Sequence, residues 1–260
     1  MENLNVAIIQ ANLVWHNAEA NRNNFSEKIK LLSNEVDLIV LPEMFTTGFT
    51  MQPNKVAETM QGETLAWMKK LALEKNTAIT GSVVIEENNN YYNRLLFVFP
   101  SGKVEYYNKK HLFSYAGEDE IYSAGNDKVI ITYKNWKICP LICYDLRFPV
   151  WSRNVENYDL LIYVANWPKI RVSAWNTLLK ARAIENMSYV IGVNRVGKDA
   201  NDIDYNGYST VINCLGENSK ILEEKEYVEI FTLDKNHLIK SRKKFNFLAD
   251  KDNFKLERDS

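Results

Sequence analysis

The N-terminal part of the chain alternates short apolar runs with apolar residues at helical spacing. Three runs have the length of buried strands: "LNVAIIQA" (4–11), "DLIVLPE" (37–43) and "AITGSVVIE" (78–86). Between them, Phe25, Ile29 and Leu32 predict a helix over roughly 19–34. A second helix is predicted by the spacing of Leu65, Met68 and Ala72. A hairpin follows, in which "LLFVFP" and "KVEYY" are joined at Ser101-Gly102.

The C-terminal part repeats this order. "KVIITY" and "WKICPLICY" predict a hairpin, 147–156 a short helix, and 159–166 a strand. The next helix carries Trp175, Leu178 and Leu179 on one face, and "SYVIGVN" predicts the strand after it. Two more strands are expected around a turn at Gly216-Glu217. Strands that alternate with helices, together with hairpins, predict mixed sheets with helices outside them, an α/β architecture.

The chain is expected to form a single domain over residues 1–260, because no stretch rich in Gly, Pro or Ser divides it. Its last segment, 240–260, mixes charges with apolar side chains at Phe245, Phe247, Leu248 and Phe254. This composition predicts an arm that packs on another surface.

Composition excludes several classes of function. The chain is 46% hydrophobic and 25% charged, which is typical of a globular protein. A net charge of −1 argues against nucleic acid or an anionic membrane as the main partner. The apolar runs are too short to span a bilayer, and the N-terminus lacks the pattern of a secretory signal. Three cysteines without metal-ligand spacing predict a reduced cytoplasmic protein that has no metal site. We expect no cofactor.

Two candidate catalytic residues follow apolar strands. Glu43 comes directly after "LIVLP", and in open α/β sheets ligands bind at the carboxyl ends of strands. A carboxylate held there in a poorly hydrated site would act as a base near neutrality. Lys109 and Lys110 end the strand "VEYYN", where an ammonium can stabilise an oxyanion. The alternatives are a solvated loop acid and a solvated strand end.

A third candidate, Cys143, ends the strand "WKICPLIC". A helix beginning near Arg147 would offer backbone N–H groups that lower the pKa of the thiol. The alternative is an inert buried cysteine, which is the role we expect for Cys139 and Cys214. Since all three candidates close strands, one rim of the sheets could bring together a base, a cation and a nucleophile.

Four segments of the sequence resemble the nitrilase (carbon–nitrogen hydrolase) superfamily, whose members use a Glu-Lys-Cys triad. The segments are "LPEMFTTGF", "YNKKHLF", "CYDLRFP" and "WNTLLKARAIENMSYVIGVNRVG". The resemblance covers nearly the whole chain and implies that the triad is Glu43, Lys109 (not Lys110) and Cys143. It also implies a four-layer α-β-β-α sandwich of two mixed sheets. Homodimers of this family stack helix faces, which suggests that the arm at 240–260 packs on a partner subunit.

The resemblance also assigns supporting roles. Many family members use a second glutamate, for which the spacing favours Glu118, with Glu120 as the alternative. The backbone N–H of Tyr144 is expected to hold the oxyanion together with Lys109. His111 is expected to be structural and to bond a neighbouring backbone group. A Cys–His pair is the alternative.

The substrate is predicted from the branch that the sequence resembles. Tyr144-Asp145 after the cysteine is typical of amidase branches, and "CYDLRFPVWSRN", "NWP" (166–168) and "FLADKDNF" resemble bacterial omega-amidases. Those enzymes hydrolyse the terminal amide of 2-oxoglutaramate and 2-oxosuccinamate. The open alternatives are an amidase for deaminated glutathione or an N-carbamoyl amino acid, acyl transfer to an amine, and a catalytically silent binding homologue. Four residues are candidates for substrate contact: Phe45, Arg147, Trp167 and Arg171.

Overall fold

The first of two β-sheets contains both the first and the last strand in chain order. The computed structural model describes residues 3–256, and within them this sheet has six strands. Their order across the sheet is β13 (Tyr227–Leu233), β1 (Leu4–Gln10), β2 (Leu38–Val40), β3 (Ala78–Glu87), β4 (Asn90–Val98) and β5 (Val104–Asn108). Strands β1, β2 and β3 are parallel to one another, and the other neighbours are antiparallel.

The second sheet has seven strands in the described residues and the same mixed character. Its order is β10 (Val196–Lys198), β11 (Asp204–Ile212), β9 (Tyr189–Asn194), β8 (Leu160–Ala165), β7 (Trp136–Ile142) and β6 (Ile131–Tyr133), and β12 (Asn218–Glu223) also pairs with β11. Strands β7, β8 and β9 are parallel. Each sheet therefore has a parallel centre bracketed by antiparallel strands, as the repeated order in the sequence predicted.

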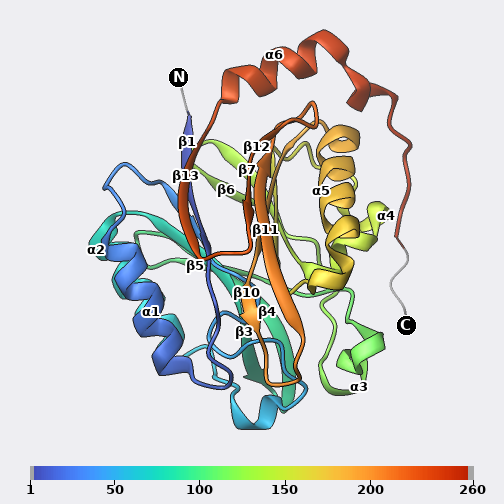
Figure 1. Cartoon of the computed structure of the whole chain (residues 1–260). Helices are drawn as coiled ribbons and strands as arrows, with labels where there is room; N and C mark the ends of the chain where they lie inside the picture. Colours follow the sequence, from blue (N-terminus) through green and yellow to red (C-terminus); the bar gives the residue numbers. More distant parts are fainter. Residues whose placement is uncertain (1–2, 257–260) are drawn as a thin grey trace.

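Helices cover the outer faces of the two sheets (Figure 1). The helices α1 (Ala18–Lys30) and α2 (Glu63–Lys75) lie on the first sheet, and α5 (Val172–Asn186) and the short α4 (Pro149–Ser152) lie on the second. The one-turn α3 (Glu118–Ile121) lies near the lower ends of the strands in this view, and α6 (Lys235–Phe245) crosses above their upper ends. Five short 3₁₀ turns complete the elements: η1 (Pro53–Lys55), η2 (Ser114–Ala116), η3 (Cys143–Arg147), η4 (Lys169–Arg171) and η5 (Phe247–Asp250). The predicted α-β-β-α sandwich is confirmed.

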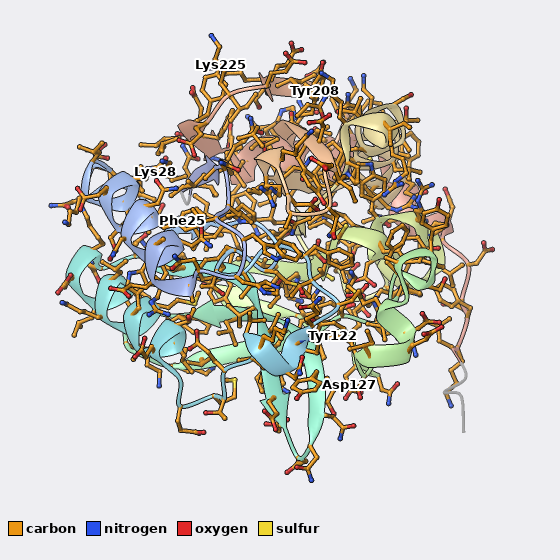
Figure 2. The ribbon with its side chains drawn as sticks, turned by 60° about the horizontal axis from the view of Figure 1, so that its bottom comes forward. Phe25, Lys28, Tyr122, Asp127, Tyr208 and Lys225 are labelled. Carbon is orange, nitrogen blue, oxygen red and sulfur yellow. The ribbon has the colours of Figure 1, made fainter. Side chains whose placement is uncertain are left out.

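The core has two layers, which explains why the central strands are apolar without interruption. In β1, Val6 and Ile8 face the layer between the two sheets, whereas Ala7 and Ile9 face the layer under α1 and α2. A strand that is buried on both faces needs apolar residues at consecutive positions. Phe25 packs into the helix-side layer (Figure 2), with the other residues that predicted the two N-terminal helices: Ile29, Leu32, Leu65, Met68 and Ala72.

Two local predictions need correction. The short helix expected over 147–156 forms only as the single turn of α4, which follows the turn η3. Pro149 explains this, because it lacks an N–H group and disfavours a helical conformation at the residue before it, and Phe148 has φ −115° and ψ 86°. A third strand, β13, follows the two expected near Gly216, and it crosses to the first sheet to pair antiparallel with β1.

The C-terminal arm is fixed to its own chain at its start. Asp234 caps α6 by accepting hydrogen bonds from the N–H groups of Asn236 and His237. Arg242 donates to Asp159 over 3.0 Å and to the carbonyl of Met187 over 2.7 Å. Beyond α6, apolar side chains are exposed at Phe247, Phe254 and Leu256. Residues 257–260 of the predicted arm lie outside the described residues. No helix within 3–256 has the length and apolar character needed to cross a membrane.

Candidate active site

Three strand ends bring the candidate catalytic residues together. Glu43 follows β2, Lys109 follows β5, and Cys143 begins η3 directly after β7. The Nζ atom of Lys109 lies 3.0 Å from Oε1 of Glu43. The Cys143 thiol is hydrogen-bonded to the Glu43 carboxylate. Glu43 thus contacts both the cation and the thiol, and the three groups come from both sheets.

Glu118, and not Glu120, completes this cluster. Nζ of Lys109 lies 3.0 Å from Oε1 and 2.8 Å from Oε2 of Glu118. The Oε2 atom also accepts the N–H group of Phe113 over 2.6 Å. Glu118 is fully buried, whereas Glu120 is exposed on the opposite side of the one-turn helix α3. The ammonium of Lys109 is therefore held between two carboxylates.

The turn that carries Cys143 is held in an unusual backbone conformation. Cys143 has φ 42°, in the left-handed region that non-glycine residues adopt only when their surroundings enforce it. The buried carboxylate of Asp145 accepts the N–H group of Ile142 over 3.0 Å and the hydroxyl of Tyr107 over 2.8 Å. From helix α5, Arg182 donates to the carbonyl of Leu146 over 2.7 Å. These hydrogen bonds stabilise the turn so that the sulfur faces Glu43.

The charges of the cluster set its resting protonation. Burial disfavours the ammonium of Lys109, but Glu118 and Glu43 outweigh this effect and raise its pKa above the usual value. Burial raises the pKa of Glu118, Lys109 lowers it, and Glu43 raises it, with a net upward direction. Burial and the nearby Glu43 raise the pKa of the Cys143 thiol well above its usual value, and Lys109 offsets this only in part.

The expectation of a lowered thiol pKa was therefore wrong. It rested on the N-terminus of a helix near Arg147, which is only the single turn of α4, and two carboxylates in the site oppose a second negative charge. Cys143 is protonated at rest, so it needs a base to become a nucleophile. Glu43 is the carboxylate that touches the thiol.

His111 belongs to the support of the turn. Its Nδ1 atom lies 2.7 Å from Oδ1 of Asp145, and its ring stacks on Phe148 with 3.7 Å between centroids. The bonding partner is thus a carboxylate and not the backbone group that we expected. In this arrangement His111 contacts the residues behind Cys143 instead of forming a Cys–His pair with it.

A cavity of about 620 Å³ opens above Cys143 and Lys109. Three of the four predicted substrate contacts line it: Arg147, Trp167 and Arg171. The guanidinium of Arg147 lies 5.1 Å from the ring centroid of Trp167, and that of Arg171 lies 5.3 Å from the ring of Phe113. Within residues 3–256 neither arginine forms an ion pair with an acid, so both are available to an anionic ligand.

The prediction for Phe45 was wrong. Its ring is fully buried in the layer under α1 and α2, where it lies 5.5 Å from the ring of Phe25 and 5.9 Å from that of Trp67. The left-handed turn at Met44, with φ 42°, follows Glu43 directly and separates its carboxylate from this apolar core. Burial of the aromatic ring among the helices is favoured by the hydrophobic effect.

Three residues of the site were not predicted from the sequence. Asn93 on β4 donates from Nδ2 to Glu43 over 2.8 Å, and the N–H group of Asn166 donates to Oε2 of Glu43 over 2.8 Å. The hydroxyl of Tyr122 (Figure 2) donates to the carbonyl of Thr50 in the cavity wall over 2.7 Å. A polar residue inside the apolar run "YYNRLLFV" was the available signal for Asn93, because a buried amide needs hydrogen-bond partners. In the part of the chain described, no group of three or more His, Cys, Asp and Glu side chains is arranged to hold a metal ion.

The fold is that of the carbon–nitrogen hydrolases. Residues 5–243 match the family model "Carbon-nitrogen hydrolase", and the chain belongs to this family. It is similar to the omega-amidase YafV of Escherichia coli K12, with 44% identity over 98% of this chain and 100% of the relative. It is 34% identical to the 2-oxoglutaramate amidase of Bacillus subtilis, over 71% of this chain and 73% of that one.

A solved structure extends the comparison to three dimensions. XC1258 from Xanthomonas campestris, a CN-hydrolase superfamily protein whose crystal structure has an arsenic adduct in the active site, is 41% identical and gives a TM-score of 0.97. The match covers 99% of this chain and 100% of that chain. The predicted family and the predicted nitrilase-like fold are confirmed.

Proposed function

We propose that this protein is an omega-amidase that hydrolyses short 2-oxo dicarboxylic acid monoamides, such as 2-oxoglutaramate and 2-oxosuccinamate, to the acid and ammonia. The observation that carries the proposal is that Lys109 contacts both Glu43 and Glu118, and that Glu43 contacts the Cys143 thiol, beside a cavity. The high identity to an omega-amidase over the full length of that relative supports the same substrate class.

In the first half of the reaction, the sulfur of Cys143 attacks the amide carbon while Glu43 accepts the thiol proton. The ammonium of Lys109 and the N–H group of Tyr144 stabilise the oxyanion that forms on the amide oxygen. Glu43 then gives its proton to the amide nitrogen, the C–N bond breaks, and ammonia leaves. The acyl group remains on the sulfur as a thioester.

In the second half, a water molecule gives a proton to Glu43 and attacks the thioester carbon. The C–S bond breaks, the acid is released, and the sulfur regains its proton from Glu43. Glu118 contacts Lys109 through both of its oxygens and keeps the ammonium aimed at the reacting centre. Glu43 serves as the base in both halves because in each half it gives up the proton that it has accepted.

The far end of the substrate carries a carboxylate, for which the cavity offers Arg147 and Arg171. Both line the cavity, and neither forms an ion pair within residues 3–256. A guanidinium group binds a carboxylate through two parallel hydrogen bonds and is well suited to this role. Trp167 forms part of the wall beside Arg147.

Two further properties belong to the proposal. Cys139, Cys143 and Cys214 are all free, which suits a reducing compartment such as the cytoplasm. The apolar side chains exposed along 245–256 suit contact with a second copy of the chain, so the active form is proposed to be a homodimer. Light scattering coupled to size exclusion checks the dimer, and a monomer at micromolar concentration contradicts it.

An ammonia-release assay tests the function. The purified protein should turn over 2-oxoglutaramate much faster than glutamine, a nitrile, deaminated glutathione or an N-carbamoyl amino acid. Preference for deaminated glutathione or the N-carbamoyl compound would assign another amidase of the family. If none of these compounds is turned over and Cys143 fails to react with a thiol-selective electrophile at neutral pH, the protein is a silent binding homologue.

A further inference from the structure

Asn93 contacts more of the catalytic cluster than its position on a structural strand requires. It lies in β4 and is fully buried. Its Nδ2 atom donates to Oε1 of Glu43 over 2.8 Å and to Oε1 of Glu118 over 3.3 Å. Its backbone carbonyl accepts the N–H group of Lys109 over 3.0 Å. One residue therefore connects both carboxylates and the lysine between them.

The orientation of the Asn93 amide is set by the two carboxylates. Both hydrogens of its NH₂ group are used by acceptors, and the reverse orientation would point Oδ1 at two negative groups. Oδ1 itself has no hydrogen-bond partner within residues 3–256. Leaving a buried acceptor unpaired is unfavourable. The amide orientation therefore gives hydrogen bonds to both glutamates while Oδ1 of Asn93 remains without one in this part of the chain.

The cluster needs such a donor because its charges do not balance. Four titratable groups of the described residues face Glu43: Lys109 after β5, Glu118 in α3, Tyr122 at the end of α3, and Cys143 in η3. Two carboxylates share a single ammonium, and like charges this close favour protonation of one of them. Glu43 accepts a backbone N–H group from Asn166, and Glu118 accepts one from Phe113. The side-chain amide of Asn93 donates to both carboxylates.

We propose that Asn93 is a positioning residue that holds Glu43 and Glu118 side by side on Lys109, with Glu43 placed to accept the thiol proton. The proposal rests on the amidase function given above, since it explains how the base of that reaction is held in place. Asn93 is absent from the lining of the cavity, so it acts through the glutamates and not on the substrate.

The test compares Asn93→Ala with a matched control, Asn154→Ala. Asn154 is also fully buried, and its amide donates to the carbonyls of Tyr158 and Asn186, neither of which belongs to the cluster. For Asn93→Ala the acid limb of the pH profile of kcat/KM should move up by about one pH unit. On that limb kcat/KM should therefore be about tenfold lower than in the wild type, with KM nearly unchanged. Asn154→Ala should lose stability but keep the midpoint of the limb.

A second readout separates this inference from the proposed function. The rate at which iodoacetamide alkylates Cys143, followed by mass spectrometry, depends on the base but requires no amide substrate. Cys139 and Cys214 are buried and serve as internal controls for an intact fold. If wild-type protein does not hydrolyse 2-oxoglutaramate, the function is wrong, while the alkylation curves still test Asn93.

The inference is overturned if folded Asn93→Ala gives acid limbs that coincide with those of the wild type in both measurements. If Asn93→Ala does not fold, the isosteric Asn93→Asp takes its place. A third carboxylate beside Glu43 and Glu118 should move the limb of the alkylation curve upward by more than one unit. An unchanged limb in that variant also overturns the inference.

Discussion

Replacing Lys109 by Met should remove the one cation within residues 3–256 that forms ion pairs with Glu43 and Glu118. Nζ lies 3.0 Å from Glu43 and 2.8 Å from Glu118, and all three side chains are almost completely buried. Removing one partner from a buried ion pair costs about 3–5 kcal/mol, because the remaining charge is left without compensation. Losing one oxyanion donor lowers kcat by about 10²–10³. We therefore expect a loss of at least about 10³ in kcat, since the unpaired Glu43 will also be partly protonated.

The stability loss should depend on pH in a defined direction. In Lys109→Met, the carboxylates face each other without an ammonium, so their pKa values in the folded state exceed those in the unfolded state. The folded state then binds more protons, and stability relative to the wild type falls as pH rises through those values. As the pH is lowered from the raised pKa toward 5, Lys109→Met regains about 1.4 kcal/mol of stability per pH unit.

Urea unfolding of Lys109→Met and wild type near pH 5 and pH 8 measures this difference. Lys110→Met is the matched control, because Lys110 has the same side chain at the next position and forms no ion pair within residues 3–256. It should change stability by less than about 0.5 kcal/mol and leave kcat intact. A Lys109→Met deficit that is equal at both pH values, or a kcat within tenfold of wild type, would refute the reasoning.

Three further predictions follow from the site. Cys143→Ala should abolish ammonia release and Cys143→Ser should nearly do so, because no other nucleophile of comparable strength touches Glu43; wild-type turnover in the alanine variant would exclude the thioester. Arg147→Gln and Arg171→Gln should each raise KM for 2-oxoglutaramate about tenfold or more and spare an uncharged amide of similar length; equal losses for both substrates would exclude a carboxylate contact. His111→Asn should lower stability by about 1–3 kcal/mol through its bond to Asp145, yet retain the thioester burst in stopped-flow kinetics; a lost burst in folded protein would instead place His111 in the chemistry.

The sequence alone determined the layers and the strand ends. Central strands such as β1 and β8 are buried on both faces, so they appear as uninterrupted apolar runs, and the helices show one apolar face each. Glu43, Lys109 and Cys143 were predicted together because each comes at or near the end of a predicted strand, and the carboxyl ends of strands gather at one rim.

Contacts between distant segments decided the rest. Glu43 binds Asn93, which is 50 positions away, and Asn166, which is 123 positions away, and no local pattern encodes such pairs. The choice of Glu118 over Glu120, the burial of Phe45 and the pairing of β13 with β1 likewise depend on which surfaces meet once the sheets pack. Local sequence sets the conformation of a segment, whereas a buried charge or ring finds its partner only in the folded chain, where hydrogen bonds and apolar contacts replace those with water.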